Sequence, residues 1–150
     1  MHMESPSPRL SVRNLTTVFH TRAGRFVAVD NVSFEVHSGE CVGIVGESGS
    51  GKSVAALSIM GLVDYPGVIE SGVIEFSGQD LRTLSPDALR RIRGEEIGII
   101  FQDPQTSLNP LFTVGRQMID IVRAHRKVSK QDASQLAIEK LKLVGISAAE

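Results

Sequence analysis

Residues 41–54 read CVGIVGESGSGKSV, a short apolar run that passes directly into a glycine-rich loop and then into a helical pattern. The run Cys41–Val45 predicts a strand buried on both faces, because uninterrupted apolar residues are typical of central strands in parallel sheets. The pattern from Ser53 to Leu62 predicts a helix packed closely on that strand. A strand, a glycine loop and a helix in this order indicate an α/β fold.

The loop fits the phosphate-binding pattern G-x-x-x-x-G-K-[ST]. Its glycines allow backbone angles closed to other residues, so that successive N–H groups can point at an anion at the start of a helix. We expect Lys52 to contact the β- and γ-phosphates of ATP and the Ser53 hydroxyl to bind Mg²⁺. The residues expected to bind the nucleotide are Gly46, Glu47, Ser48, Gly49, Ser50, Gly51, Lys52, Ser53 and Val54. The dinucleotide pattern G-x-G-x-x-G is excluded, because Val54 stands where its third glycine is needed.

The composition is that of an ordinary soluble protein, with 41% hydrophobic and 22% charged residues and a formal net charge of -1. This near-neutral balance argues against nucleic acid as a partner. No apolar run approaches the roughly 18 residues of a membrane-spanning helix, so membrane association is expected to come through partners. Cys41 is the one cysteine of the sequence. Its position in an apolar run predicts a buried structural thiol in a reducing compartment.

Outside the loop, the first half of the chain has the pattern of antiparallel strands. Residues 1–8 are treated as a tail or tag, since they are short and rich in Ser and Pro. Leu10–Asn14 and Val32–Val36 alternate apolar and polar residues, with a polar, glycine-containing turn at residues 21–25 between them. Val73–Phe76 alternates in the same way and predicts a further antiparallel strand.

The second half is mostly helical in pattern. Residues 85–94 begin with Ser-Pro-Asp and end in glycine, which predicts a short helix. Ile97–Phe101 predicts a second buried strand. Two amphipathic helices are expected at residues 113–127 and 129–144, the second ending at Gly145.

The loop, and Gln102 after the second apolar run, resemble the ATP-binding subunits of ABC transporters. Within that family the chain is similar to the oligopeptide, dipeptide and nickel importer ATPases, over about residues 10–146. The segments that carry this resemblance are AVDNVSF at 28–34, VGESGSGKSV at 45–54, IRG at 92–94 and IFQDPQTSLNP at 100–110.

The resemblance implies a P-loop NTPase core with an antiparallel β subdomain at residues 9–104 and the start of a helical subdomain at 105–150. Phe19 falls where the family places an aromatic side chain that stacks on adenine. Gln102 matches the glutamine that reaches Mg²⁺ and the attacking water, so Gln102 and Lys52 are the expected catalytic residues, with Ser53 and Gln102 as metal ligands.

The resemblance also implies an activity, partners and a location. The activity is ATP hydrolysis that energises the import of peptides or nickel. The partners are transmembrane permease subunits, a second ATPase subunit of the same or a related kind and, indirectly, an extracellular solute-binding protein. The location is peripheral, on the cytoplasmic face of the cell membrane.

The family's signature loop, its acidic strand and its switch histidine are expected beyond position 150. We therefore expect the chain to be the N-terminal part of a longer ATPase. Alone, it is expected to bind nucleotide without hydrolysing it and to expose an apolar sheet edge that promotes aggregation.

Two alternatives stay open at this level. Asp103 could hold the metal after the strand Ile97–Phe101, in a compact P-loop kinase or GTPase. Pro104 follows at once, however, and no guanine-reading Asn-Lys-x-Asp is present. The other alternative is a nucleotide-binding module that senses ATP without hydrolysing it.

Overall fold

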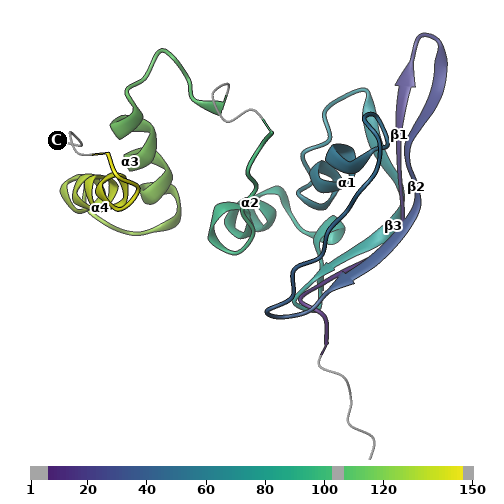
Figure 1. The fold of residues 1–150 in the computed structure, drawn as a ribbon, viewed down its shortest axis with the longest axis horizontal. Helices are drawn as coiled ribbons and strands as arrows, with labels where there is room; N and C mark the ends of the chain where they lie inside the picture. Colours follow the sequence, from purple (N-terminus) through teal and green to yellow (C-terminus); the bar gives the residue numbers. More distant parts are fainter. Residues whose placement is uncertain (1–6, 103–106, 147–150) are drawn as a thin grey trace, which may run out of the picture. The chain divides into compact units, whose positions relative to one another are not determined.

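The computed structural model describes residues 7–102 and 107–146. The chain divides into two compact units, residues 1–89 and 90–150, which are taken in turn (Figure 1). The predicted boundaries at residues 8 and 104 stay a prediction.

The first unit contains an antiparallel sheet that, within the described residues, has four strands in the order β2-β1-β3-β4. Strand β1 (Leu10–Thr21) lies between β2 (Gly24–Val36) and β3 (Gly67–Phe76), and the short β4 (Gln79–Asp80) pairs with β3. A turn at Arg22 and Ala23 joins β1 to β2. The antiparallel strands predicted at the start of the chain and at residues 73–76 are confirmed.

Strand β1 is bent by paired bulges in which two asparagines adopt left-handed backbone angles. Asn14 has φ +50° and Asn31 on β2 has φ +49°, a region that asparagine tolerates better than most residues. The Asn14 side-chain amide donates to the Asn31 side-chain oxygen at 2.8 Å. Gly72 on β3 lies against this bend, where a Cβ would stand 2.6 Å from the Cα of Leu15. The bend curves the sheet around its core.

Ion pairs between solvent-accessible side chains also link strands of this sheet, one between the neighbours β1 and β3 and one between β2 and β3, which lie on either side of β1. Arg13 donates to Glu75 at 2.7 Å and Arg25 pairs with Glu70 at 2.5 Å. The hydrogen bond from each arginine holds the pKa of its glutamate below the usual value.

Helix α1 (Lys52–Ile59) packs against β1 and β2 through a buried polar contact. The hydroxyl oxygens of Thr17 and Ser58 lie 2.8 Å apart, and Ser58 also donates to the Val54 carbonyl at 2.7 Å. Both side chains are buried. Because the Ser58 hydroxyl donates its one hydrogen to Val54, the Thr17 hydroxyl donates to Ser58 Oγ, and both hydroxyls have a partner in the core. The apolar residues of this core are Val12, Leu15, Val18, Val29, Ala55, Met60, Ile74, Phe76 and Leu81.

The strand predicted at Cys41–Val45 is not formed in the structure. The segment has no strand assignment and its side chains are exposed, Val45 to 92%. A strand buried on both faces needs a hydrogen-bonded neighbour on each side, and within the described residues no strand pairs with it. The prediction of a buried thiol at Cys41 is also wrong, because Cys41 lies in this segment and is exposed.

Helix α2 (Pro86–Glu95) runs across the division between the units. The Ser85 hydroxyl accepts a hydrogen bond from the Ala88 backbone N–H at 3.3 Å and so caps the helix that the Ser-Pro-Asp start predicts. The helix is interrupted at Gly94, whose φ is +86°. This is the end that the sequence predicts.

The strand predicted at Ile97–Phe101 is also not formed. The segment makes one isolated parallel bridge, between Arg93 and Ile97, and Ile100 is 93% exposed. As with residues 41–45, no described strand lies beside it to complete a ladder.

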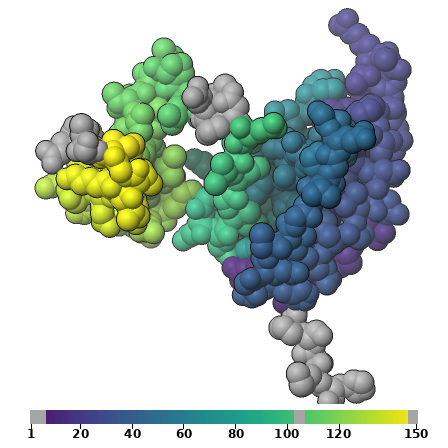
Figure 2. Space-filling view, in the orientation of Figure 1, coloured from purple at the N-terminus to yellow at the C-terminus, as the bar shows by residue number. Residues whose placement is uncertain are grey.

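The second unit contains two packed helices, α3 (Val114–His125) and α4 (Lys130–Leu143). Thr113 caps α3 and Ser129 caps α4, each through its side-chain oxygen. Figure 2 shows α3 in green and α4 in yellow on this face of the unit. The predicted helices are confirmed with slightly shorter bounds. None of the helices in the described ranges combines the length and apolar character needed to cross a bilayer.

Replacing Ser58 with Ala is expected to lower the free energy of unfolding by about 1–3 kcal/mol, because the buried Thr17 hydroxyl then loses its partner. Adding Thr17→Val removes that hydroxyl as well, so the double variant should be more stable than Ser58→Ala alone. Urea unfolding of both variants measures the difference. Ser38→Ala, at an exposed position, is the control and should change stability by less than about 0.5 kcal/mol. A Ser58→Ala variant as stable as this control would contradict the buried role of the serine.

Candidate functional site

The glycine loop lies in the first unit and leads directly into α1. A turn closes its middle, where the Ser50 backbone N–H donates to the Glu47 carbonyl at 3.2 Å. Gly49 and Gly51 have φ of +83° and +91°, angles at which other residues are strained. Both glycines are therefore required by the backbone path.

Gly51 is also required by packing, because it lies against the backbone of β2. The carbonyl oxygen of Ala28 occupies the space that a Cβ at position 51 would need, and a Val29 methyl group lies 3.6 Å from that point. Thr17 pairs with Val29 while the next residue, Val18, pairs with Val27. Ala28 is thus the extra residue of a β-bulge. The bulge places the main chain of β2 against the start of α1.

The N-terminal end of α1 is open to an anion. No described side chain caps the helix at Gly51, and its first turn contains no acidic residue. The first N–H groups of any helix have no carbonyl partner within the helix, and they carry the positive end of its dipole. The loop and the helix start therefore offer unpaired backbone donors without a competing carboxylate.

Lys52 places its ammonium group over the loop. Its Nζ donates to the carbonyl oxygens of Gly46 at 2.8 Å and Glu47 at 2.7 Å, and to Ser50 Oγ at 3.2 Å. A phosphate oxygen is a stronger acceptor for an ammonium group than a neutral carbonyl. The loop glycines, the open helix start and this cation fit a phosphate group.

The remaining loop positions are accessible from solvent. Ser53 is exposed in the first turn of α1, so its hydroxyl can reach a ligand at the helix start, while Val54 is half-buried. The exposed positions of the loop are Gly46, Glu47, Ser48, Gly49 and Ser50.

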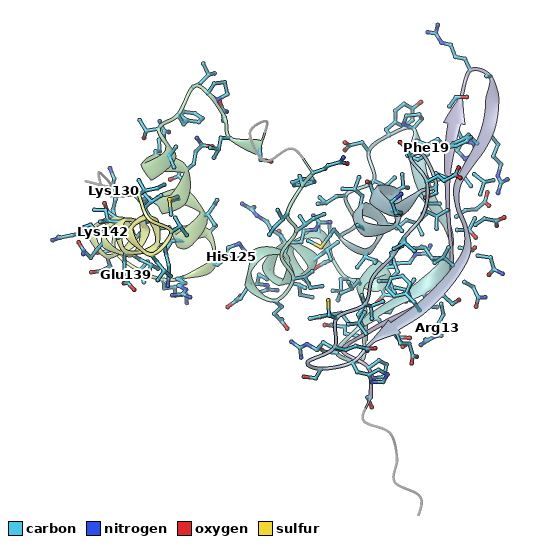
Figure 3. The ribbon with its side chains drawn as sticks, viewed as in Figure 1. Arg13, Phe19, His125, Lys130, Glu139 and Lys142 are labelled. Carbon is cyan, nitrogen blue, oxygen red and sulfur yellow. The ribbon has the colours of Figure 1, made fainter. Side chains whose placement is uncertain are left out.

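Phe19 is half-buried near the hairpin end of β1, where its ring packs against Gly67 on β3 (Figure 3). Its partner on β2 is Phe26, whose side chain is 58% exposed. Directly opposed residues of an antiparallel pair present their side chains on the same face. Phe26 stands two residues from Ala28, roughly 7 Å along the strand. Phe26 is not among the residues that the sequence pattern predicts for the site, and the hairpin register, with its turn at residues 21–25, is the signal that could have identified it.

Gln102 is exposed and belongs to the second unit, whereas the glycine loop belongs to the first. Its expected role beside Mg²⁺ therefore stays a prediction. Asp103, the metal residue of the kinase-like alternative, lies outside the described residues.

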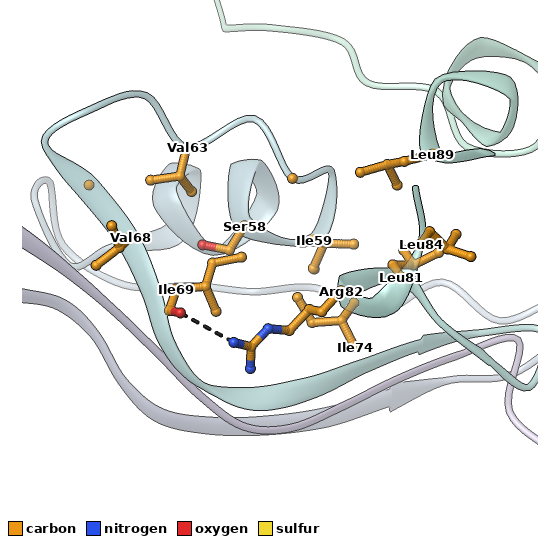
Figure 4. Close-up of a pocket in the computed structure, with 12 residues that line it drawn as sticks. Ser58, Ile59, Val63, Val68, Ile69, Ile74, Leu81, Arg82, Leu84 and Leu89 are labelled. Carbon is orange, nitrogen blue, oxygen red and sulfur yellow. Dashed lines mark hydrogen bonds between the residues drawn. The ribbon is translucent and has the colours of Figure 1, made fainter. Parts of the chain in front are cut away.

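A separate pocket of about 370 Å³ lies in the first unit beside the C-terminal end of α1 (Figure 4). The guanidinium of Arg82, in the short helix η1 (Leu81–Thr83), extends along it. Arg82 donates to the carbonyl of Ile69 at 3.3 Å and to that of Gly72. Because these main-chain oxygens occupy the cation, the pocket offers mainly apolar walls and no phosphate-binding group.

Comparison with known sequences supports the reading of the loop. The family profile described as ABC transporter matches residues 29–149. The dipeptide transport ATP-binding protein DppD of Escherichia coli K12 is 49% identical over 137 residues, which are 91% of this chain and 42% of that protein. A putative peptide import ATP-binding protein of Brucella melitensis is 47% identical and covers 95% of this chain and 44% of its own length. The chain thus spans about two fifths of these curated relatives.

Solved structures agree on the fold. The dimeric structure of MJ0796, a bacterial ABC transporter cassette, matches with a TM-score of 0.75 and 29% identity, covering 89% of this chain and 56% of that one. The same cassette in a post-hydrolysis state, bound to ADP and Pi, matches with a TM-score of 0.76 and 28% identity. The predicted α/β P-loop fold of an ABC ATPase is confirmed.

Two glycine substitutions separate backbone strain from packing at the loop. Gly51→Ala is expected to destabilise the protein by about 2–5 kcal/mol, because the left-handed angle and the clash with the Ala28 carbonyl act together. Gly49 has the same kind of backbone angle, but nothing lies within 4 Å of the methyl group that Gly49→Ala adds. A smaller destabilisation of about 1–2 kcal/mol is therefore expected. Urea unfolding without nucleotide measures both, and equal losses would show that the Ala28 contact contributes nothing.

Proposed function

Because the chain belongs to the ABC transporter family, with the family profile covering residues 29–149 of 150, we propose that it is the ATP-binding part of an importer ATPase. The observation that carries this proposal is the loop at the open start of α1 with the Lys52 ammonium held over it. In the whole protein, ATP hydrolysis energises the import of peptides. The names of the dipeptide and peptide import relatives support peptide as the cargo, with nickel as the alternative.

The loop binds the triphosphate of ATP in this proposal. Backbone N–H groups of the loop and of the first turn of α1 donate to phosphate oxygens, while Lys52 leaves the loop carbonyls for the β- and γ-phosphates. Phe19 stacks on the adenine, and the exposed Phe26 opposite it widens the aromatic surface.

Mg²⁺ is the proposed cofactor, and when bound it neutralises charge that develops on the phosphates. The Ser53 hydroxyl and the Gln102 side-chain oxygen are hard ligands of the type that Mg²⁺ prefers. Gln102 also orients the attacking water. The two ligands come from different units of the chain, so their assembly is part of the proposal.

The proposed partners follow from the family and from the relatives. Permease subunits in the cytoplasmic membrane carry the substrate, and a second ATPase subunit completes the site. The dimeric cassette of similar fold supports such pairing. The chain is proposed to act at the cytoplasmic face of the membrane, with a solute-binding protein acting indirectly through the permease. The kinase or GTPase reading and the purely sensory reading are not favoured by the relatives.

Lys52→Ala is expected to weaken ATP binding by at least about a hundredfold, since the buried phosphates lose the cation that balances their charge. Titration with a fluorescent ATP analogue measures the affinity. Lys130→Ala, on the exposed surface of α4, is the matched control and should bind as the unchanged protein does. Unchanged affinity in Lys52→Ala would show that this loop is not the nucleotide site.

Gln102→Ala and Asp103→Ala distinguish the proposed site from the kinase-like alternative. In the whole protein, Gln102→Ala is expected to lower the turnover of ATP about ten- to a hundredfold. ATP affinity should change little, because loop contacts dominate binding. Mg²⁺-dependent phosphate release measures both variants. A near-normal Gln102→Ala beside an inactive Asp103→Ala would favour the alternative.

A further inference from the structure

Charge is divided unevenly between the two units of the chain. Residues 1–89 contain six Lys or Arg against ten Asp or Glu, a net of -4, whereas residues 90–150 contain ten against seven, a net of +3. The near-neutral total therefore conceals a basic second unit. An excess of one sign on a surface attracts ligands of the other.

Part of this positive charge gathers in one pocket of the second unit, which we call the basic pocket. Its volume is about 430 Å³ and it lies at the C-terminal end of α3. Within the part of the chain that the structure describes, no ion pair involves Arg91, Arg123, Arg126 or Lys127. On the sheet, by contrast, Arg13 and Arg25 each meet a glutamate. The titratable groups that line the basic pocket are Arg91, Glu95, Arg123, His125, Arg126 and Lys127.

The negative end of the α3 dipole offsets only part of this positive charge. Basic residues near a helix C-terminus are stabilised by its dipole, which is equivalent to about half a negative charge. Four permanent cations and a single carboxylate, Glu95, line the basic pocket. The pocket therefore retains positive charge that the helix does not neutralise.

An apolar groove between α3 and α4 adjoins the basic pocket. The groove has a volume of about 330 Å³, with Ile121 and Val122 on α3 and Leu136 and Ala137 on α4 among its lining residues. His125 and Arg126 line both cavities, and Figure 3 labels His125 at the end of α3. Positively charged side chains therefore border the apolar groove.

We propose that the basic pocket and the apolar groove together bind an anionic phospholipid. Arg123 and Arg126 hold the phosphate, since guanidinium groups match phosphate oxygens in a bidentate geometry. An acyl chain lies in the groove, where its burial removes apolar surface from water. A free phosphate would use the basic pocket alone and leave the groove without a ligand. The proposal uses none of the loop residues and is independent of the proposed nucleotide site.

Vesicle flotation of the whole protein tests this proposal. Phosphatidylcholine vesicles with phosphatidylglycerol should bind it, and phosphatidylcholine alone should not. Arg123→Gln with Arg126→Gln is expected to weaken binding roughly thirtyfold, because each basic residue near an anionic surface strengthens binding by about fivefold. Ile121→Gln should also weaken vesicle binding, while leaving the weak binding of glycerol phosphate unchanged. Ile121 is 63% exposed, so this change should not disturb folding.

The matched control is Lys130→Gln with Lys142→Gln, which removes the same charge from α4 outside both cavities (Figure 3). It should bind anionic vesicles nearly as well as the unchanged protein. Equal losses in the two double variants would overturn the proposal in favour of diffuse charge. Glycerol phosphate that binds as tightly as vesicles would identify a free phosphate ligand, and equal binding to polyglutamate would identify an acidic protein segment; either result overturns it. Circular dichroism and ATP binding of each variant confirm that folding is intact.

Discussion

The close approach of Gly51 to the Ala28 carbonyl is the contact on which the candidate site depends. It joins the loop to a bulge of β2, and so fixes where α1 begins relative to the sheet. The direction of the first N–H groups of α1 follows from that start. The buried pair of Thr17 and Ser58 then holds the helix on the central strand. The addition of a single methyl group at position 51 would therefore disturb both the phosphate site and the fold.

The two candidate anion sites of this chain use different chemistry. At the loop, the donors are mainly backbone N–H groups with one cation, Lys52, whose position is set by three neighbouring oxygens. At the end of α3, the donors are long side chains without carboxylate partners among the described residues. Backbone donors cost little conformational entropy on binding, since the fold has already ordered them, whereas arginines must be ordered by their ligand. The loop is accordingly suited to selective binding and the basic pocket to a membrane surface.

Not every pattern that predicts a strand produces one. Residues 41–45 and 97–101 are apolar enough for central strands, yet both lack a ladder in the structure. Among the strands that do form, short turns join β1 to β2 and β3 to β4. Strand β3 also pairs with β1, which lies far from it in the sequence. Apolar composition shows that a segment is suited to burial, but hydrogen-bonded partners decide whether the burial occurs.

By itself, the sequence determined the features that depend on neighbouring residues. These are the phosphate loop, the N-cap at Ser85, and the antiparallel hairpin at the start of the chain, because turn and cap chemistry act over a few positions. Only the tertiary structure decided that Cys41 is exposed, that Phe26 opposes Phe19, and that the end of α3 forms a basic pocket beside an apolar groove. Each of these depends on strand register or on helix packing, which bring together residues that no local pattern relates.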